Sequence, residues 1–135
     1  MFDTKIALVV RGDLATWQRL NVVAFLATGI AAAAPEMIGK PYVDAAGRTY
    51  GRMLVQPMVV FEADRAGLQS AHAIGLAREL TLLPYVFAMF STGHDDANRE
   101  AFKAEDPADL DLVGLALRGS RKAVDKAVKG LALHR

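Results

Sequence analysis

Cysteine is absent from this chain of 135 residues, and tryptophan occurs only once. The lack of thiols excludes disulfide bonds, cysteine nucleophiles and cysteine-ligated metals. An excess of charge is also missing, because 16 basic and 15 acidic side chains give a net charge of +1, which provides no overall attraction to nucleic acid or membrane. The apolar window at residues 22–34 is too short to cross a bilayer. We therefore expect a cytoplasmic protein without membrane contact.

Metal-ligand and phosphate-binding patterns are equally scarce. His94, Asp95 and Asp96 are adjacent in the chain, and no second histidine or cysteine stands at ligand spacing from them. The glycines match neither a phosphate-loop nor a dinucleotide-binding pattern. We therefore expect neither a metal ion nor a cofactor.

Short apolar runs alternate with segments of helical periodicity, and the length suits a single domain covering residues 1–135. Strands are predicted at residues 5–10, 57–63, 84–90 and 110–117, with a small hairpin at 42–50. Helices are predicted at residues 17–34 and 66–80, in a short stretch from about residue 95, and after residue 120, with N-caps at Thr16, Asp64 and Ser120. This alternation predicts an α/β fold, a three-layer α/β/α sandwich around a four-stranded, mixed and mainly parallel sheet.

The first predicted helix is apolar almost all round. One of its faces carries Trp17, Leu20, Ala24, Ala27 and Ala31, and we expect Trp17 to pack in the core. The remaining sides carry Val22, Val23, Phe25 and Leu26, so no clean polar face is left. Such a helix is either buried on two sides or meets another subunit, and we expect a homo-oligomer.

Two polar clusters follow predicted strands, where ligands of open α/β sheets bind. The first contains Arg11, Asp13, Gln18 and Asn21. Arg11 could pair with a carboxylate or phosphate, and the two amides, one helical turn apart, could read an amide or a base edge. The alternative is that Asp13 pairs with Arg11 and that the amides satisfy nearby backbone groups.

The second cluster is the sequence STGHDDANR at residues 91–99. Its backbone amides at a helix start could hold an anion, and His94 could act as an acid or base near neutral pH. The alternative is a capped helix with a solvated acidic first turn. We favour a ligand site here, made by Thr92, Asp95, Asn98 and Arg99, because a cap alone explains Thr92 or Asp95 but not the whole group.

Several long segments of the sequence resemble those of a known family. The segments WQRLNVVAFLATGI, PEMIGKPYVDAAG, MFSTGHDDANR and VDKAVKGL are similar to those of domain-of-unknown-function family two thousand, a group of small, mostly bacterial proteins. The opening KIALVVRGDL and the order of elements resemble peptidyl-tRNA hydrolase II more distantly. The resemblance implies a hydrolase-like fold with a four-stranded mixed sheet, and an oligomer. Residues 15–20, however, lack the lysines and glycines of the hydrolases' first loop.

Three functional hypotheses follow. The first is a protein that binds a small polar or anionic molecule at Arg11, Gln18, Asn21 and residues 92–99. The second is a hydrolase of peptidyl-tRNA or a related ester, with tRNA as partner, in which Asp13 or His94 is the general base and Arg11 or Lys5 stabilises negative charge. The third is a structural homo-oligomer assembled through the first helix.

Overall fold

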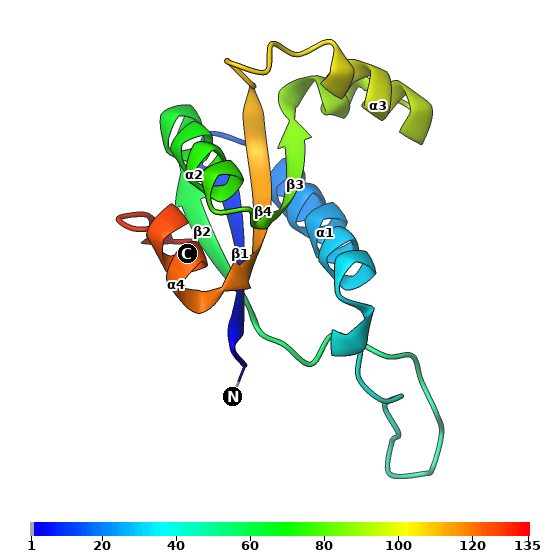
Figure 1. Cartoon of the computed structure of the whole chain (residues 1–135). Helices are drawn as coiled ribbons and strands as arrows, with labels where there is room; N and C mark the ends of the chain where they lie inside the picture. The colour runs from blue at the N-terminus through cyan, green and yellow to red at the C-terminus, as the bar shows by residue number, and fades with distance from the viewer. Residues whose placement is uncertain (1) are drawn as a thin grey trace.

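The computed structural model describes residues 2–135 and contains five strands and four α-helices (Figure 1). The strands are β1 (Thr4–Arg11), β2 (Met58–Ala63), β3 (Thr81–Val86), β4 (Leu112–Ser120) and β5 (Ala132–Leu133). The helices are α1 (Thr16–Ala33), α2 (Arg65–Ala77), α3 (Asp95–Lys103) and α4 (Arg121–Ala127), with the 3-10 turns η1 (Pro35–Met37) and η2 (Phe87–Ser91). The strands form one open sheet in the order β3-β4-β1-β2-β5.

The prediction of a four-stranded, mainly parallel sheet is wrong. Only β1 and β2 are parallel, whereas the β1–β4, β3–β4 and β2–β5 pairs are antiparallel. The reason is α3, which packs against η2 at one end of the sheet (Figure 1). It makes no crossover, so the chain returns into β4 from the end at which β3 stopped. The two-residue β5 was missed because it is too short to show alternation.

The boundaries of two strands also differ from the prediction. β3 begins at Thr81 rather than Pro84, and Phe87–Ser91 form a 3-10 turn instead of continuing the strand. Pro84 is tolerated inside β3 because β3 is an edge strand, where a missing backbone donor can face away from the sheet. β4 runs from Leu112 to Ser120 rather than from residue 110 to 117.

Helices cover both faces of the sheet, as a strand without a polar face requires. On one face, Val22, Leu26 and Ile30 of α1 pack with Ile6, Leu8 and Val10 of β1. On the other face, α2 and α4 contribute the buried side chains Leu68, Ala71, Val124 and Ala127. The layers and the continuous apolar strand β1 confirm the predicted α/β architecture in its coarse form.

The start and the buried side of α1 correct two predictions. The N-cap is Ala15 rather than Thr16, and the Gln18 side chain accepts a hydrogen bond from the Ala15 N–H at 3.0 Å. The buried side is set by residues 22, 26 and 30, so Trp17 is 60% exposed instead of packing in the core. The predicted caps Asp64 and Ser120 are confirmed, since their side chains accept from Gly67 and Ala123 N–H groups.

Residues 38–57 form an extended arm between η1 and β2, which projects away from the layers of the fold (Figure 1). Antiparallel bridges join Ile38 to Leu54 and Val43 to Thr49, so the predicted hairpin at residues 42–50 is confirmed. The turn at its tip places Gly47 at φ 85°, a conformation that favours glycine. The arm therefore has an ordered shape of its own, held by local hydrogen bonds.

The tip of the arm is expected to loosen in acid. Asp44 accepts hydrogen bonds from Arg48 N–H, Ala46 N–H and the Tyr50 hydroxyl, and the first of these contributes most to holding its pKa below the ordinary 3.8. A lowered pKa means that the ionised form stabilises the turn above pH 3.8 and that this contribution is lost as the pH falls through the lowered pKa. NMR titration of the Ala46 and Arg48 amides should show one step below pH 3.8, which Asp44→Asn should abolish. A step at or above 3.8 would contradict the hydrogen-bonded turn.

Candidate functional site

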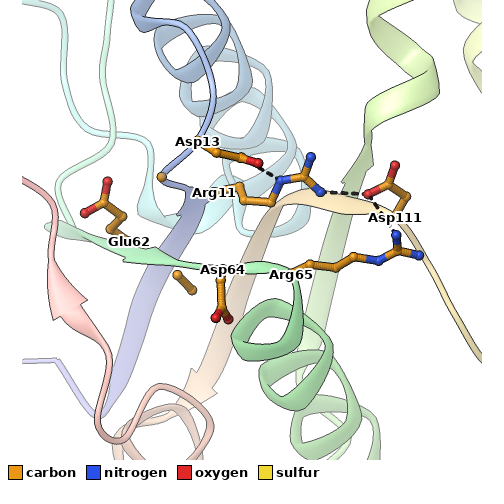
Figure 2. A pocket seen from close by; sticks show the side chains of 8 residues that line it. Arg11, Asp13, Glu62, Asp64, Arg65 and Asp111 are labelled. Carbon is orange, nitrogen blue, oxygen red and sulfur yellow. Dashed lines mark hydrogen bonds and ion pairs between the residues drawn. The ribbon is translucent and has the colours of Figure 1, made fainter.

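A hollow of about 900 Å³ lies where β1 and β2 end and β4 begins (Figure 2). We call it the strand-end hollow. Arg11 and Asp13 follow from β1, Glu62 to Arg65 come from the junction of β2 with α2, and Asp111 immediately precedes β4. The parallel β1–β2 pair brings the carboxyl ends of both strands to one edge of the sheet, which is where ligands of open α/β sheets bind.

Arg11 is the central side chain of the strand-end hollow and is tied to two carboxylates. Its Nε lies 2.8 Å from Asp13 Oδ1, its Nη1 lies 2.7 Å from Asp111 Oδ1, and its side chain is 13% exposed. Burial works to lower the pKa of Arg11, but the hydrogen bonds to Asp111 and Asp13 outweigh it, so the pKa is raised. The alternative in which Asp13 pairs with Arg11 is therefore what the structure contains.

The second arginine of this hollow is engaged as well. Asp111 lies between Arg11 and Arg65 (Figure 2), and Arg65 also contacts Asp109 at 3.0 Å. Four carboxylates line the hollow against these two guanidinium groups. The strand-end hollow is thus acidic overall, and an incoming anion would have to displace a carboxylate that is already bound.

A second depression runs between α1 and α3, and we call it the α1–α3 groove. It consists of two adjoining hollows of about 510 and 380 Å³, which share Phe25, Tyr85, Met89, Asp95 and Asn98. The smaller hollow adds Trp17, Asn21, Phe90, Thr92, Gly93 and His94, and the larger adds Leu26, Gly29, Leu83, Pro84, Arg99 and Phe102. Each hollow has the size of an ordinary small-molecule site.

Aromatic rings form one wall of the groove. The Trp17 and Phe90 rings meet edge to face at 5.9 Å between centroids, and Tyr85 lies 5.4 Å from Phe90 and 6.2 Å from Phe25. Trp17 and Phe25 remain 60% and 57% exposed, so ring surface is accessible to a ligand. Burial raises the pKa of Tyr85, so its phenol stays protonated to a higher pH than that of an exposed tyrosine.

Polar side chains line the smaller hollow of the groove beside these rings. Asn21 comes from α1 and Asn98 from α3, and they are the only two asparagines in the sequence. The Thr92 hydroxyl lies between Asn98 Oδ1 and the Met89 carbonyl oxygen, 2.9 Å from the latter, and so links η2 to α3. His94 caps α3, since its Nδ1 accepts the Ala97 N–H at 3.2 Å. A neutral ring in this arrangement carries its proton on Nε2.

The residues proposed from the sequence are divided between these places. The α1–α3 groove brings together Asn21, Thr92, His94, Asp95, Asn98 and Arg99. Arg11 and Asp13 lie in the strand-end hollow instead. Lys5 is paired with Asp125 at 2.6 Å near the start of β1, about 20 Å from Arg11 at ~3.3 Å per strand residue. Gln18 lines neither depression and supports the start of α1.

Several lining residues were not singled out from the sequence as site residues. Asp111 gives no local signal, because its partner Arg11 is 100 positions away and only the β1–β4 pairing brings them together. Phe25, Tyr85 and Phe90 lie in segments that the sequence predicts as a helix and a strand. The exposed position of Trp17 could have been predicted only by choosing Val22, Leu26 and Ile30 as the buried face of α1.

Two features of residues 2–135 bear on other classes of function. No group of three or more histidine, cysteine, aspartate or glutamate side chains there is arranged to hold a metal ion. No helix in the same range is both long and apolar enough to cross a membrane.

Comparison with known proteins places the chain in a family. Residues 4–135 match the family described as protein of unknown function, DUF2000. Among solved structures, the chain is similar to the protein of unknown function Atu0240 from Agrobacterium tumefaciens strain C58, with 50% sequence identity, a TM-score of 0.97 and 100% of each chain covered. No curated protein matches it. The family expected from the sequence phrases is confirmed, and the chain belongs to the DUF2000 family, whose function is unknown.

Proposed function

We propose that this protein binds a small planar molecule with an amide-like or base-like edge in the α1–α3 groove. One observation carries the proposal: Asn21 and Asn98, from two separate helices, line one hollow together with four aromatic rings. An asparagine amide offers a donor and an acceptor side by side, which is how asparagine pairs with the edge of adenine. Exposed aromatic rings stack on any base and contribute about 1–3 kcal/mol per base.

The charges of the groove favour a neutral ligand over an anionic one. The N-terminus of α3 is already supplied with the carboxylates of Asp95 and Asp96, and one of its N–H groups is taken by His94. Arg99, the cation that lines the groove, forms an ion pair with Asp95 at 2.8 Å. A phosphate bound in the groove would meet the Asp95 carboxylate, which lines both hollows, so of the polar and anionic ligands expected from the sequence we propose the uncharged polar class.

Trp17 provides a direct readout, since it is the only tryptophan and lines the groove. Adenosine, guanosine, cytidine and uridine should be titrated against the protein with excitation at 295 nm, and adenosine 5′-monophosphate should be the charged comparison. At least one nucleoside is expected to change the emission saturably, and adenosine should bind more tightly than its monophosphate. Linear quenching by all five compounds up to millimolar concentration would overturn the proposal, and tighter binding of the monophosphate would overturn the uncharged class.

The second candidate function is hydrolysis of peptidyl-tRNA or a related ester on a peptidyl-tRNA hydrolase II-like scaffold. Its support is the strand-end hollow, where Arg11 ends β1 and Asp13 follows it, at positions that resemble those of the hydrolases' first strand. Against it, Arg11 is held by two carboxylates and Lys5 lies near the far end of β1. Release of labelled peptide from peptidyl-tRNA, abolished by Arg11→Met, would establish this activity. If no peptide is released at a protein concentration at which a genuine hydrolase cleaves all of the substrate, this activity is excluded.

A further inference from the structure

Exposed hydrophobic side chains are concentrated on two elements of the molecule. Within residues 2–135, thirteen large hydrophobic side chains are exposed, and eight of them belong to α1 or to the arm. The α1 members are Trp17, Leu20 and Phe25, and the arm members are Tyr42, Val43, Tyr50, Met53 and Val55. Such gathering on adjoining elements, rather than scatter over the surface, is typical of a surface that contacts another protein.

The arm has a shape suited to gripping a side chain. Residues of its two halves, Gly39 to Val43 on one side and Met53 with Val55 on the other, surround a hollow of about 380 Å³. This hollow belongs to the arm alone, and the side chains around it include Tyr42, which is 56% exposed, and Met53, which is 60% exposed. An ordered hairpin with an apolar hollow costs free energy in water unless another surface covers it.

Charge indicates which surface the arm would meet. The arm contains Lys40, Arg48 and Arg52 against a single acidic residue, Asp44, and so has a net charge of +2. Residues 95–106, which comprise α3 and the turn after it, contain five acidic and two basic residues and have a net charge of −3. In one chain these segments lie at opposite ends of the molecule (Figure 1), so the arm cannot reach α3 of its own chain.

We propose that the arm of a second copy of this chain lies along the exposed side of α1 and reaches α3. Two copies related by a two-fold axis beside the C-terminal ends of their α1 helices would place these helices antiparallel and end to end, so that the arm of each copy runs along the α1 of the other from its C-terminal end toward Trp17. The arm continues beyond the end of its own α1 by about 20 Å, from Ile38 to its tip, at ~3.3 Å per extended residue. This length carries its basic residues to the acidic α3 of the partner.

The area available agrees with a stable dimer. Four of these eight side chains are aromatic, and at half exposure they offer roughly 100 Å² each, since an aromatic side chain has about 150–250 Å² in total. They supply about 400 Å² per copy, half of the ~800 Å² that each partner usually contributes to a specific interface, and the four aliphatic side chains and the polar groups of the arm add to this area. The partner's arm also closes the open side of the α1–α3 groove over Trp17 and Phe25. The inference thus deepens the proposed function, but its tests require no ligand.

Oligomeric state is the first test. Sedimentation equilibrium should give twice the 14.5 kDa of one chain. Replacing residues 43–49 with two glycines removes the tip but retains the Ile38–Leu54 bridge at the base of the arm, and this variant should be monomeric with an unchanged circular dichroism spectrum. A monomeric wild-type protein, or a tipless variant that remains dimeric, would overturn the proposal.

Engineered thiols test the location of the arm, because the chain has no cysteine of its own. The variants Val43→Cys and Ala24→Cys, mixed and oxidised, should form a disulfide between copies. Ser70→Cys, on the exposed side of α2, is the matched control and should not link to Val43→Cys. A link to position 70 instead of position 24 would show that the arm binds another face and would refute the proposed arrangement.

Charge reversal tests contact with α3. Arg48→Glu with Arg52→Glu should raise the dimer dissociation constant several-fold, and adding Asp96→Lys with Glu100→Lys to the same chain should restore it. Asp96 and Glu100 are exposed and one turn apart on α3. Failure of the second pair to restore the dimer would exclude α3 as the contact. Nucleoside binding measured on the same variants is a separate result, so a failed dimer and a failed ligand site are distinguishable.

Discussion

Replacing Asn21 with leucine is expected to weaken nucleoside binding by about 5- to 150-fold, the equivalent of the ~1–3 kcal/mol carried by a bidentate contact with a base edge. Asn21 is exposed and leucine favours helix, so the free energy of unfolding should change little. Isothermal titration calorimetry with the tightest-binding nucleoside measures the loss. Asn98→Leu, on α3, should give a loss of similar size.

Thr28→Val is the matched control for these variants. Thr28 is exposed on α1, its hydroxyl is hydrogen-bonded to the Phe25 carbonyl oxygen at 2.7 Å, and it lines neither hollow of the groove. Binding by Thr28→Val should equal that of the wild-type protein. If Asn21→Leu and Asn98→Leu both bound the nucleoside as tightly as this control, the asparagines would not contact the ligand.

Leu115→Ala is expected to lower the free energy of unfolding by about 2–5 kcal/mol, because Leu115 is fully buried in β4 and its truncation leaves a cavity. β4 pairs with β1 on one side and β3 on the other, so the cavity would lie within the paired centre of the sheet. Urea unfolding followed by circular dichroism measures the change.

The same substitution at Leu76 provides the comparison. Leu76 is in α2 and 59% exposed, so Leu76→Ala should alter the free energy of unfolding by no more than about 0.5 kcal/mol. Equal losses for the two variants would contradict the assignment of Leu115 to the core, whereas a large loss for Leu76→Ala alone would indicate an interface on α2.

The sequence predicts the elements of this fold better than their directions. β1 could be recognised because five consecutive residues, 6–10, are apolar, and Asp64 and Ser120 marked helix starts through their side-chain oxygens. Strand direction depends on whether a connecting helix packs across the sheet. The polar, nine-residue α3 does not pack across the sheet. Its short sequence does not predict where it packs in the fold.

The candidate site could also be predicted only in part, because local sequence does not specify how the elements pack. Asn21 and Asn98 could be proposed for one site because each follows a strand, and the structure places both in one hollow. Arg11 was expected beside them, but it points from the end of β1 toward Asp111, while Asn21 lies on the exposed side of α1. The direction of a side chain leaving a strand end depends on the neighbouring strand, which local sequence does not specify.

The most direct test of the central proposal is to locate a bound ligand. The protein should be crystallised with 8-bromoadenosine and diffraction measured at the bromine absorption edge. The anomalous difference map then locates the bromine atom before any ligand is built. We predict an anomalous peak in the α1–α3 groove, between the Trp17 ring and Asn98. A peak in the strand-end hollow beside Arg11 would contradict the proposal. So would the lack of a peak near Trp17 in crystals grown with a saturating concentration of 8-bromoadenosine.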